Sequence, residues 1–165
     1  MSDPEPTAGT GSGRVRHFGG RLAIGDRATF SKTITDADLV LFAGVTGDVH
    51  PVHLDEDYAR RAGLRGRVVH GALLVAFMSA VDSILFARTE LAAVSRGFDR
   101  VRFIKPVYVG DTITTTYEVV DIDEGLRRSD GECRCVNQDG ELVAVARHLA
   151  QIMNASGDRS PGAGA

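Results

Sequence analysis

The chain has 165 residues, a formal net charge of −3 at pH 7 and 43% hydrophobic residues. These values fit one globular domain built around a single hydrophobic core. The weak negative charge argues against nucleic acid or an anionic membrane surface as the main partner.

Only two cysteines occur in the chain, Cys133 and Cys135. Residues two apart on a strand point to the same face, and such close neighbours do not form an ordinary disulfide. We therefore expect both thiols to pack on one face of a strand, in a protein from a reducing, cytoplasmic setting.

Both ends of the chain are rich in small and polar residues. Residues 1–20 contain no apolar run of the kind found in a signal peptide or a membrane anchor, and residues 154–165 have the same polar character. We expect disordered tails over 1–20 and 154–165, and a folded domain over 21–153.

The folded part begins with short elements. Residues 28–34 fit a strand, and Thr35 fits the N-cap of a helix that ends near residues 44–47. A loop over residues 48–53 then leads to Asp55, which fits the N-cap of a second short helix over residues 56–62. Any polar cluster in that loop would therefore lie between two helices.

A long apolar segment follows, from His70 to about Arg88. It is apolar on nearly every side, as expected for a helix enclosed by other elements. Ser79, Asp82 and Ser83 interrupt it, so it falls short of the roughly 20 apolar residues of a membrane span. We expect the buried central helix of the core.

After Gly97 the pattern changes to segments rich in Val, Ile and Thr, which are typical of strands. Short turn signals separate these segments and favour antiparallel neighbours in one meander. Such a sheet can bury the long helix only by curling around it, which predicts an α+β domain of the hotdog fold. The four expected strands cover residues 101–104, 112–120, 126–136 and 142–152.

The residues that carry chemistry cluster between Gly47 and Asp55. Asp48 and His53 are five positions apart, and Pro51 between them argues for an irregular loop. A carboxylate and an imidazole that converge from such a loop can share one water molecule and move its protons.

Three motifs occur together in this chain: Gly47-Asp48-x-x-Pro51-x-His53-x-Asp55, then Val69-His70-Gly71 at the start of the long helix, then Phe103-x-Lys105-Pro106-Val107-x-x-Gly110-Asp111. With these motifs, residues 21–153 resemble the MaoC-like dehydratases, the R-specific enoyl-CoA hydratases. Their order and spacing agree with the predicted elements.

The resemblance implies reversible addition of water across a trans-2-enoyl thioester, which gives an R-3-hydroxyacyl thioester. It places Asp48 and His53 at the catalytic positions. The thioester carrier would be coenzyme A or acyl carrier protein. Coenzyme A is then part of the substrate and is not counted as a cofactor. The resemblance implies no metal or redox cofactor. Relatives of this kind share a substrate groove between subunits, so we expect a homodimer or a larger homo-oligomer.

Four further residues are expected to contribute. The free backbone N–H groups at Gly71 can stabilise the negative charge on the thioester oxygen. Ser79 matches a serine of the family that could orient the catalytic carboxylate, and His50 stands where many relatives have asparagine. Asp82 is expected near the end of the acyl tunnel, where an unpaired charge would favour short or polar acyl groups.

Other functions stay open at this point. The same fold can carry a thioesterase, and a non-catalytic acyl-binding subunit would keep the tunnel. A metal-dependent hydrolase could use Asp48, His50, His53 and Asp55 as ligands. Alternatively, Asp48 only forms a turn, His53 packs in the core and Gly71 merely starts a helix.

Overall fold

The structure is a computed structural model that describes residues 17–153. Its elements in chain order are β1 (His17–Phe18), β2 (Leu22–Ala23), β3 (Arg27–Thr33), α1 (Asp36–Thr46), α2 (Pro51–Leu54), α3 (Glu56–Arg61), α4 (Gly71–Thr89), β4 (Ala93–Phe103), β5 (Thr112–Asp123), β6 (Arg128–Val136) and β7 (Leu142–Ile152).

The tails predicted for the two ends lie outside the described residues, apart from residues 17–20. Those four residues, which we expected in the N-terminal tail, belong to a small hairpin in which β1 pairs with β2. Phe18 explains the difference, because its ring is buried in the core. A single aromatic anchor within a Gly-rich stretch thus adds residues 17–20 to the packed domain that we expected to begin at residue 21.

Five strands form one antiparallel sheet in the order β3-β5-β6-β7-β4. The consecutive strands β5, β6 and β7 form the predicted meander. The prediction that β4 precedes them in the same meander was wrong, because β4 pairs with β7 at the far edge. The turn at Gly110 and Asp111 bonds instead to Ile34, which brings β5 next to β3.

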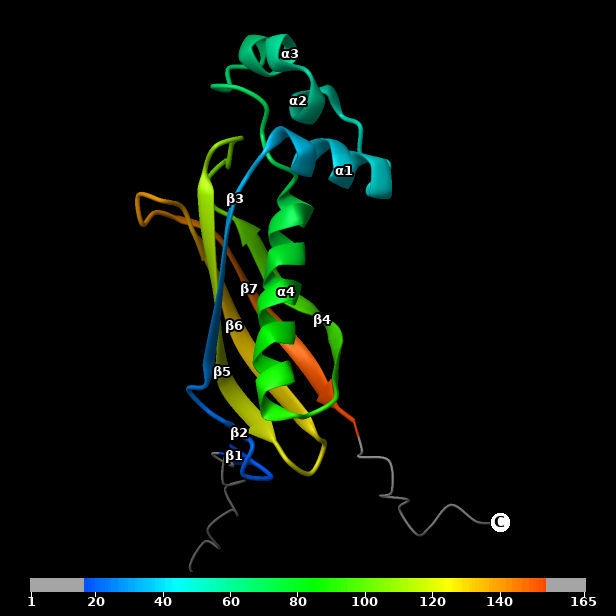
Figure 1. Cartoon of the computed structure of the whole chain (residues 1–165), viewed down its shortest axis with the longest axis vertical. Helices are drawn as coiled ribbons and strands as arrows, with labels where there is room; N and C mark the ends of the chain where they lie inside the picture. Colours follow the sequence, from blue (N-terminus) through cyan, green and yellow to red (C-terminus); the bar gives the residue numbers. More distant parts are fainter. Residues whose placement is uncertain (1–16, 154–165) are drawn as a thin grey trace, which may run out of the picture.

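Helix α4 lies along the strands on one face of this sheet (Figure 1). It is long and apolar enough to span a membrane by length and composition, but here it is the core helix of the domain. Its buried apolar side chains are Leu73, Leu74, Phe77, Met78, Val81, Leu85 and Phe86. The fold is the predicted α+β hotdog arrangement.

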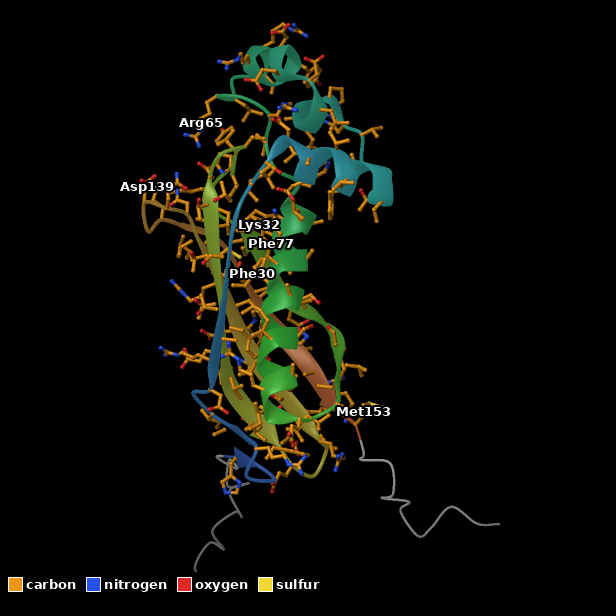
Figure 2. The ribbon with its side chains drawn as sticks, viewed as in Figure 1. Phe30, Lys32, Arg65, Phe77, Asp139 and Met153 are labelled. Carbon is orange, nitrogen blue, oxygen red and sulfur yellow. The ribbon has the colours of Figure 1, made fainter. Side chains whose placement is uncertain are left out.

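The contact between α4 and the first sheet strand illustrates this packing. Phe30 of β3 meets Phe77 of α4 edge to face, with ring centroids 5.7 Å apart (Figure 2). On β6, Cys133 and Cys135 are both buried thiols without a disulfide, on the face that covers the helix. Their packing role is the one predicted from the sequence.

Strand β4 is longer than the predicted 101–104 segment. Its register with β7 shifts between Ser95 and Gly97 and again between Asp99 and Arg102. Each irregularity breaks the two-residue alternation on which the strand prediction depended. Arg100 lies within the second one and has a positive φ of 53°.

The three short helices gather at the N-terminal end of α4 (Figure 1). Thr35 caps α1 in a reciprocal capping box with Asp38, and Asp55 caps α3 by accepting a hydrogen bond from the Tyr58 N–H. Both caps are those predicted from the sequence. The segment between them differs from the predicted loop, because Pro51 begins a short helix, α2, at the first helical position where proline fits.

Candidate active site

Asp48 directly follows the end of α1. Gly47 ends that helix in a left-handed conformation, φ 77°, and its N–H donates to the Ala43 carbonyl. The Asp48 N–H then donates to the Thr46 hydroxyl at 3.2 Å, and the His50 N–H lies 3.4 Å from Oδ1 of Asp48. These local bonds turn the chain so that the half-exposed Asp48 carboxylate faces α2.

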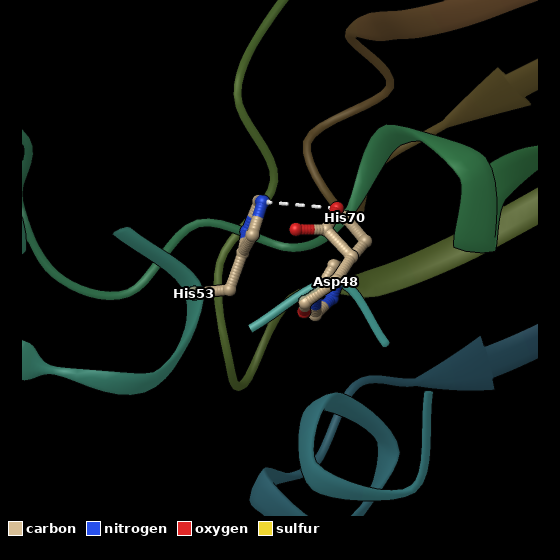
Figure 3. Close-up of side chains that lie close together, drawn as sticks. All are labelled: Asp48, His53 and His70. Atoms are coloured by element: carbon tan, nitrogen blue, oxygen red, sulfur yellow. Dashed lines mark hydrogen bonds and ion pairs between the residues drawn. The ribbon is translucent and has the colours of Figure 1, made fainter. Parts of the chain in front are cut away.

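His53 lies on α2, and the partner of its Nδ1 atom determines its chemical state. Nδ1 is 2.6 Å from the Val68 carbonyl oxygen. A carbonyl only accepts, so Nδ1 carries a proton, and in the neutral ring Nε2 therefore carries the lone pair. That Nε2 faces Oδ2 of Asp48 at 3.9 Å (Figure 3). The predicted convergence of the two side chains is present.

The separation of 3.9 Å is too long for a direct hydrogen bond. Polar groups at this distance are suited to binding one small molecule between them. A carboxylate and an unprotonated imidazole nitrogen that both face one water can remove its proton. The geometry therefore supports acid–base chemistry on a shared water.

A third side chain, His70, directly precedes Gly71 and completes the cluster. Its ring is buried, and its Nε2 lies 3.0 Å from the backbone oxygen of Asp48. It also stacks on His53, with ring centroids 3.8 Å apart and an interplanar angle of 24°. No side-chain cap bond forms at the start of α4, so capping is not its role.

Ligand atoms of Asp48, His53 and His70 lie within 4.8 Å of one another, which raises the question of a metal ion. An imidazole binds a metal through a lone pair in the plane of its ring. Two stacked rings direct their lone pairs along nearly parallel planes, so one ion cannot satisfy both without a ring rotating. The arrangement suits stacking better than chelation.

The other two ligands of the metal alternative are engaged elsewhere. His50 is exposed at the start of α2, where its Nδ1 accepts from the Val52 N–H at 3.3 Å. Asp55 caps α3. His50 thus supports Asp48 through its backbone N–H, and its imidazole has no contact with the carboxylate among the interactions of residues 17–153.

Gly71 lies beside an apolar pocket of about 320 Å³ that also reaches His53. The first residue of α4 has no intrahelical partner for its N–H, which leaves that donor available to a ligand. A Cβ at Gly71 would come within 2.7 Å of the Phe103 ring. The glycine therefore leaves the approach to a backbone donor open, and its role in the reaction stays a prediction. The other lining residues are Val68, Val69, Leu74, Ile104, Lys105, Pro106 and Val107.

Ser79 lies further along α4, roughly 12 Å from Gly71 along the helix axis at 1.5 Å per residue. Its side chain is partly buried, and its backbone oxygen accepts a bond from the Ser83 hydroxyl. Within the described part of the chain, the Ser79 hydroxyl has no hydrogen bond to Asp48. Its orienting role stays a prediction.

Asp82 carries no isolated charge, which corrects the premise behind its predicted role. It is buried, and Oδ2 lies 3.1 Å from Nε2 of His148 on β7. The same ring contacts the Ser95 hydroxyl at 2.9 Å and, through Nδ1, the Tyr117 hydroxyl at 3.4 Å. The sequence did not reveal this partnership, because His148 lies on a strand far along the chain.

Comparison with known proteins decides the family. Residues 22–139 match the family model described as "MaoC like domain". The chain belongs to the MaoC-like family. The resemblance read from the three sequence motifs is confirmed.

Two similar proteins are named for hydration or dehydration of an acyl-CoA. The chain is 34% identical to an (R)-specific enoyl-CoA hydratase of Rhodospirillum rubrum, over 64% of this chain and 71% of that protein. It is 31% identical to a 3-hydroxybutyryl-CoA dehydratase of Methylorubrum extorquens, over 79% and 81% of the two chains.

Two similar solved structures confirm the fold. The (R)-hydratase from A. caviae, described as involved in PHA biosynthesis, matches with a TM-score of 0.74 at 26% identity, over 80% of this chain and 98% of that one. Protein af1124 from Archaeoglobus fulgidus matches with a TM-score of 0.72 at 30% identity, over 86% and 88% of the chains.

Proposed function

We propose that this protein is a hydro-lyase that adds water to a trans-2-enoyl thioester to give an R-3-hydroxyacyl thioester, and catalyses the reverse dehydration. Its relatives are named hydratases and dehydratases, which supports the reaction class. One geometric observation carries the assignment: the Asp48 carboxylate and the unprotonated Nε2 of His53 face each other across 3.9 Å, beside Gly71 and an apolar pocket.

In the hydration direction, a water bound between Asp48 and His53 loses a proton to Nε2 of His53 as its oxygen bonds to Cβ of the substrate. The π electrons of the double bond move toward Cα and onto the thioester oxygen. The imidazolium then returns the proton to Cα, so that the elements of water have been added and His53 is restored. The neighbouring Asp48 carboxylate stabilises the transient imidazolium.

The enolate oxygen that forms on the thioester needs a hydrogen-bond donor in a fixed position. The N–H at Gly71 meets this need, because α4 is held by its packing against the sheet. Positive charge at the N-terminus of a helix adds to the effect. No metal or redox cofactor takes part in this scheme.

The acyl group would extend from the pocket at Gly71 along the apolar surface of α4. Asp82 lies about three turns further on, roughly 16 Å along the helix axis. There it forms a buried polar group with His148, Ser95 and Tyr117. An alkyl chain that reached this group would break hydrogen bonds among desolvated side chains, so acyl groups that are short or have a polar end are favoured.

The carrier is coenzyme A or acyl carrier protein, in a cytoplasmic setting. Basic groups lie near the pocket: Lys105 lines it, and the exposed Arg65 guanidinium stacks over Tyr108 at 4.1 Å. Each is paired with a carboxylate, Lys105 with Glu141 and Arg65 with Asp111, and a phosphate of the carrier would take the place of that carboxylate.

The working form is a homodimer or a larger homo-oligomer. Strands β3 and β4 are the edges of the sheet, where unpaired backbone groups invite another strand. Helix α1 and the residues after it expose apolar side chains near the site, Val40, Leu41, Val45 and Val49. A second copy would cover such a surface.

Crotonyl-CoA tests the proposal directly. Loss of the enoyl absorbance without release of free thiol, and a product of R configuration, would establish the hydratase; release of free thiol would mean a thioesterase. The variants Asp48→Asn and His53→Ala should each lower kcat by at least about 10³-fold, because His53 carries the proton in both steps and Asp48 binds the water and stabilises the imidazolium. Asp57→Asn, at an exposed position on α3, is the matched control and should keep full activity.

The proposal would be overturned by folded Asp48→Asn and His53→Ala variants that retain the activity of the unmodified protein. It would equally be overturned by a protein that hydrolyses the thioester to free coenzyme A and leaves the double bond without added water.

A further inference from the structure

His70 occupies a position that the proposed reaction does not use, yet it touches both groups that the reaction needs. It precedes Gly71 and is 1% exposed. One face of its ring stacks on His53 of α2, and the Phe42 ring of α1 lies 5.0 Å away at a tilt of 48°. The ring thus connects α1 and α2 to the first residue of α4.

The hydrogen bond made by His70 determines its protonation state. Its Nε2 lies 3.0 Å from the Asp48 carbonyl oxygen, which can only accept, so Nε2 carries a proton. Nδ1 is buried and has no hydrogen-bond partner in the described part of the chain. A second proton there would be a buried donor without an acceptor, which is unfavourable. His70 is therefore a neutral ring with its single donor directed at Asp48.

We propose that His70 is a positioning residue for the acid–base pair: its Nε2–H fixes the backbone of Asp48, and its ring face fixes the orientation of the His53 imidazole. This inference rests on the proposed function. It assigns His70 no contact with substrate.

The segment that carries Asp48 needs such an anchor. Asp48 follows a left-handed glycine, and among residues 17–153 the hydrogen bonds to its own N–H and carboxylate from nearby residues are long, 3.2 Å and 3.4 Å. The His70 bond to its carbonyl comes from α4, which is packed against the sheet. This bond therefore connects α4, which the sheet holds in place, to the half-exposed Asp48.

The orientation of His53 depends on a second restraint. The bond from Nδ1 to the Val68 carbonyl fixes one point of the ring, but the ring can still pivot about that point. The stack at 3.8 Å blocks this pivot on one side. A shift of about 1 Å between reacting groups can cost roughly 10²-fold in rate.

Substitutions at His70 separate the two restraints. His70→Phe keeps a flat ring against His53 but removes the donor. His70→Gln places an amide N–H near the position of Nε2 but removes the ring, and His70→Asn carries the same amide one carbon too short. His17→Gln, at an exposed histidine in β1, is the matched control.

The readout is steady-state hydration of crotonyl-CoA, together with thermal unfolding to show that each variant is folded. We expect kcat to fall about 10- to 100-fold in His70→Phe and His70→Gln while KM changes less than about threefold, because His70 does not touch substrate. His70→Gln should retain several times the kcat of His70→Asn, because only the longer amide reaches the Asp48 carbonyl. His17→Gln should match the unmodified protein.

The inference would be overturned if folded His70 variants kept kcat within twofold of the unmodified protein while Asp48→Asn and His53→Ala were inactive. It would also be overturned if the Gln and Asn variants had equal kcat, or if the whole loss lay in KM. Retained activity in Asp48→Asn and His53→Ala would instead refute the proposed function. If His70→Phe does not fold, the comparison of Gln with Asn still decides the question.

Discussion

The buried pair of Asp82 and His148 allows a quantitative prediction about stability and pH. Burial raises the pKa of Asp82 from 3.8 to about 6 and lowers the pKa of His148 from 6.5 to about 4. Near pH 5 the folded pair therefore holds one proton, on Asp82, and the unfolded pair also holds one, on His148. Equal proton counts mean that the pair makes stability nearly independent of pH in this range.

Replacing either residue of the pair should reveal how the other one changes the free energy of unfolding with pH. Asp82 has a raised pKa, so its contribution to stability is full below pH 3.8 and is lost as the pH rises through about 6. His148 has a lowered pKa, so its contribution is full above pH 6.5 and is lost as the pH falls toward about 4. Between pH 7.5 and pH 4.5, each contribution changes by roughly 2 kcal/mol, in opposite directions.

The assay is urea unfolding of Asp82→Asn and His148→Gln at pH 7.5 and pH 4.5, with the free energy of unfolding compared with that of the unmodified protein at each pH. On acidification, Asp82→Asn should lose about 2 kcal/mol more than the unmodified protein, and His148→Gln should lose about 2 kcal/mol less. Each substitution also changes the free energy of unfolding by an amount that does not depend on pH. This amount cancels when the two pH values are compared. Asp57→Asn is the exposed control and should show no such difference.

The opposite signs would refute this reasoning. If the folded pair were an imidazolium beside a carboxylate, Asp82 would have a lowered pKa and His148 a raised one. Asp82→Asn would then resist acid better than the unmodified protein, and His148→Gln would resist it less well.

Four further predictions concern single changes. Gly71→Ala should lower kcat/KM about 10²-fold, because the new methyl group keeps the thioester away from the N–H. It should cost little stability, because the exposed Phe103 ring can move away from that methyl group. An unchanged rate would contradict the donor role. Gly131→Ala should destabilise the fold by about 3 kcal/mol in urea unfolding, because its Cβ would come within 2.0 Å of the buried Tyr117 ring, and a neutral effect would mean that this ring can move. Asp82→Leu should raise activity on longer acyl thioesters relative to crotonyl-CoA; an unchanged chain-length profile would count against a polar end to the acyl site. Treatment with a chelator should leave hydration intact, and a loss restored by added divalent metal would revive the hydrolase alternative.

The parts of the structure that the sequence predicted depend on local signals. The caps at Thr35 and Asp55 require only residues within one turn of the helix end. The long helix was recognisable because it is apolar on every side. The convergence of Asp48 and His53 was also local, since five positions separate them, although Pro51 began a helix where we predicted a loop.

The parts that the sequence did not predict depend on contacts between distant segments. Strand β4 pairs with β7 and not with its successor, and its bulges conceal the alternation of a strand. The partner of Asp82 is His148, and nothing near either residue indicates the other. Such pairings are decided by the tertiary packing, which overrides local preference.

His70 lies between these two cases and explains how the site is assembled. Its position beside Gly71 was visible in the sequence, but its contacts to Asp48 and His53 arise only when α1 and α2 fold over the end of α4. The donor at Gly71 is rigid because the sheet holds α4, whereas the acid–base pair lies on short elements with less support. Productive geometry needs these two halves at a fixed distance, and His70 is the side chain that joins them.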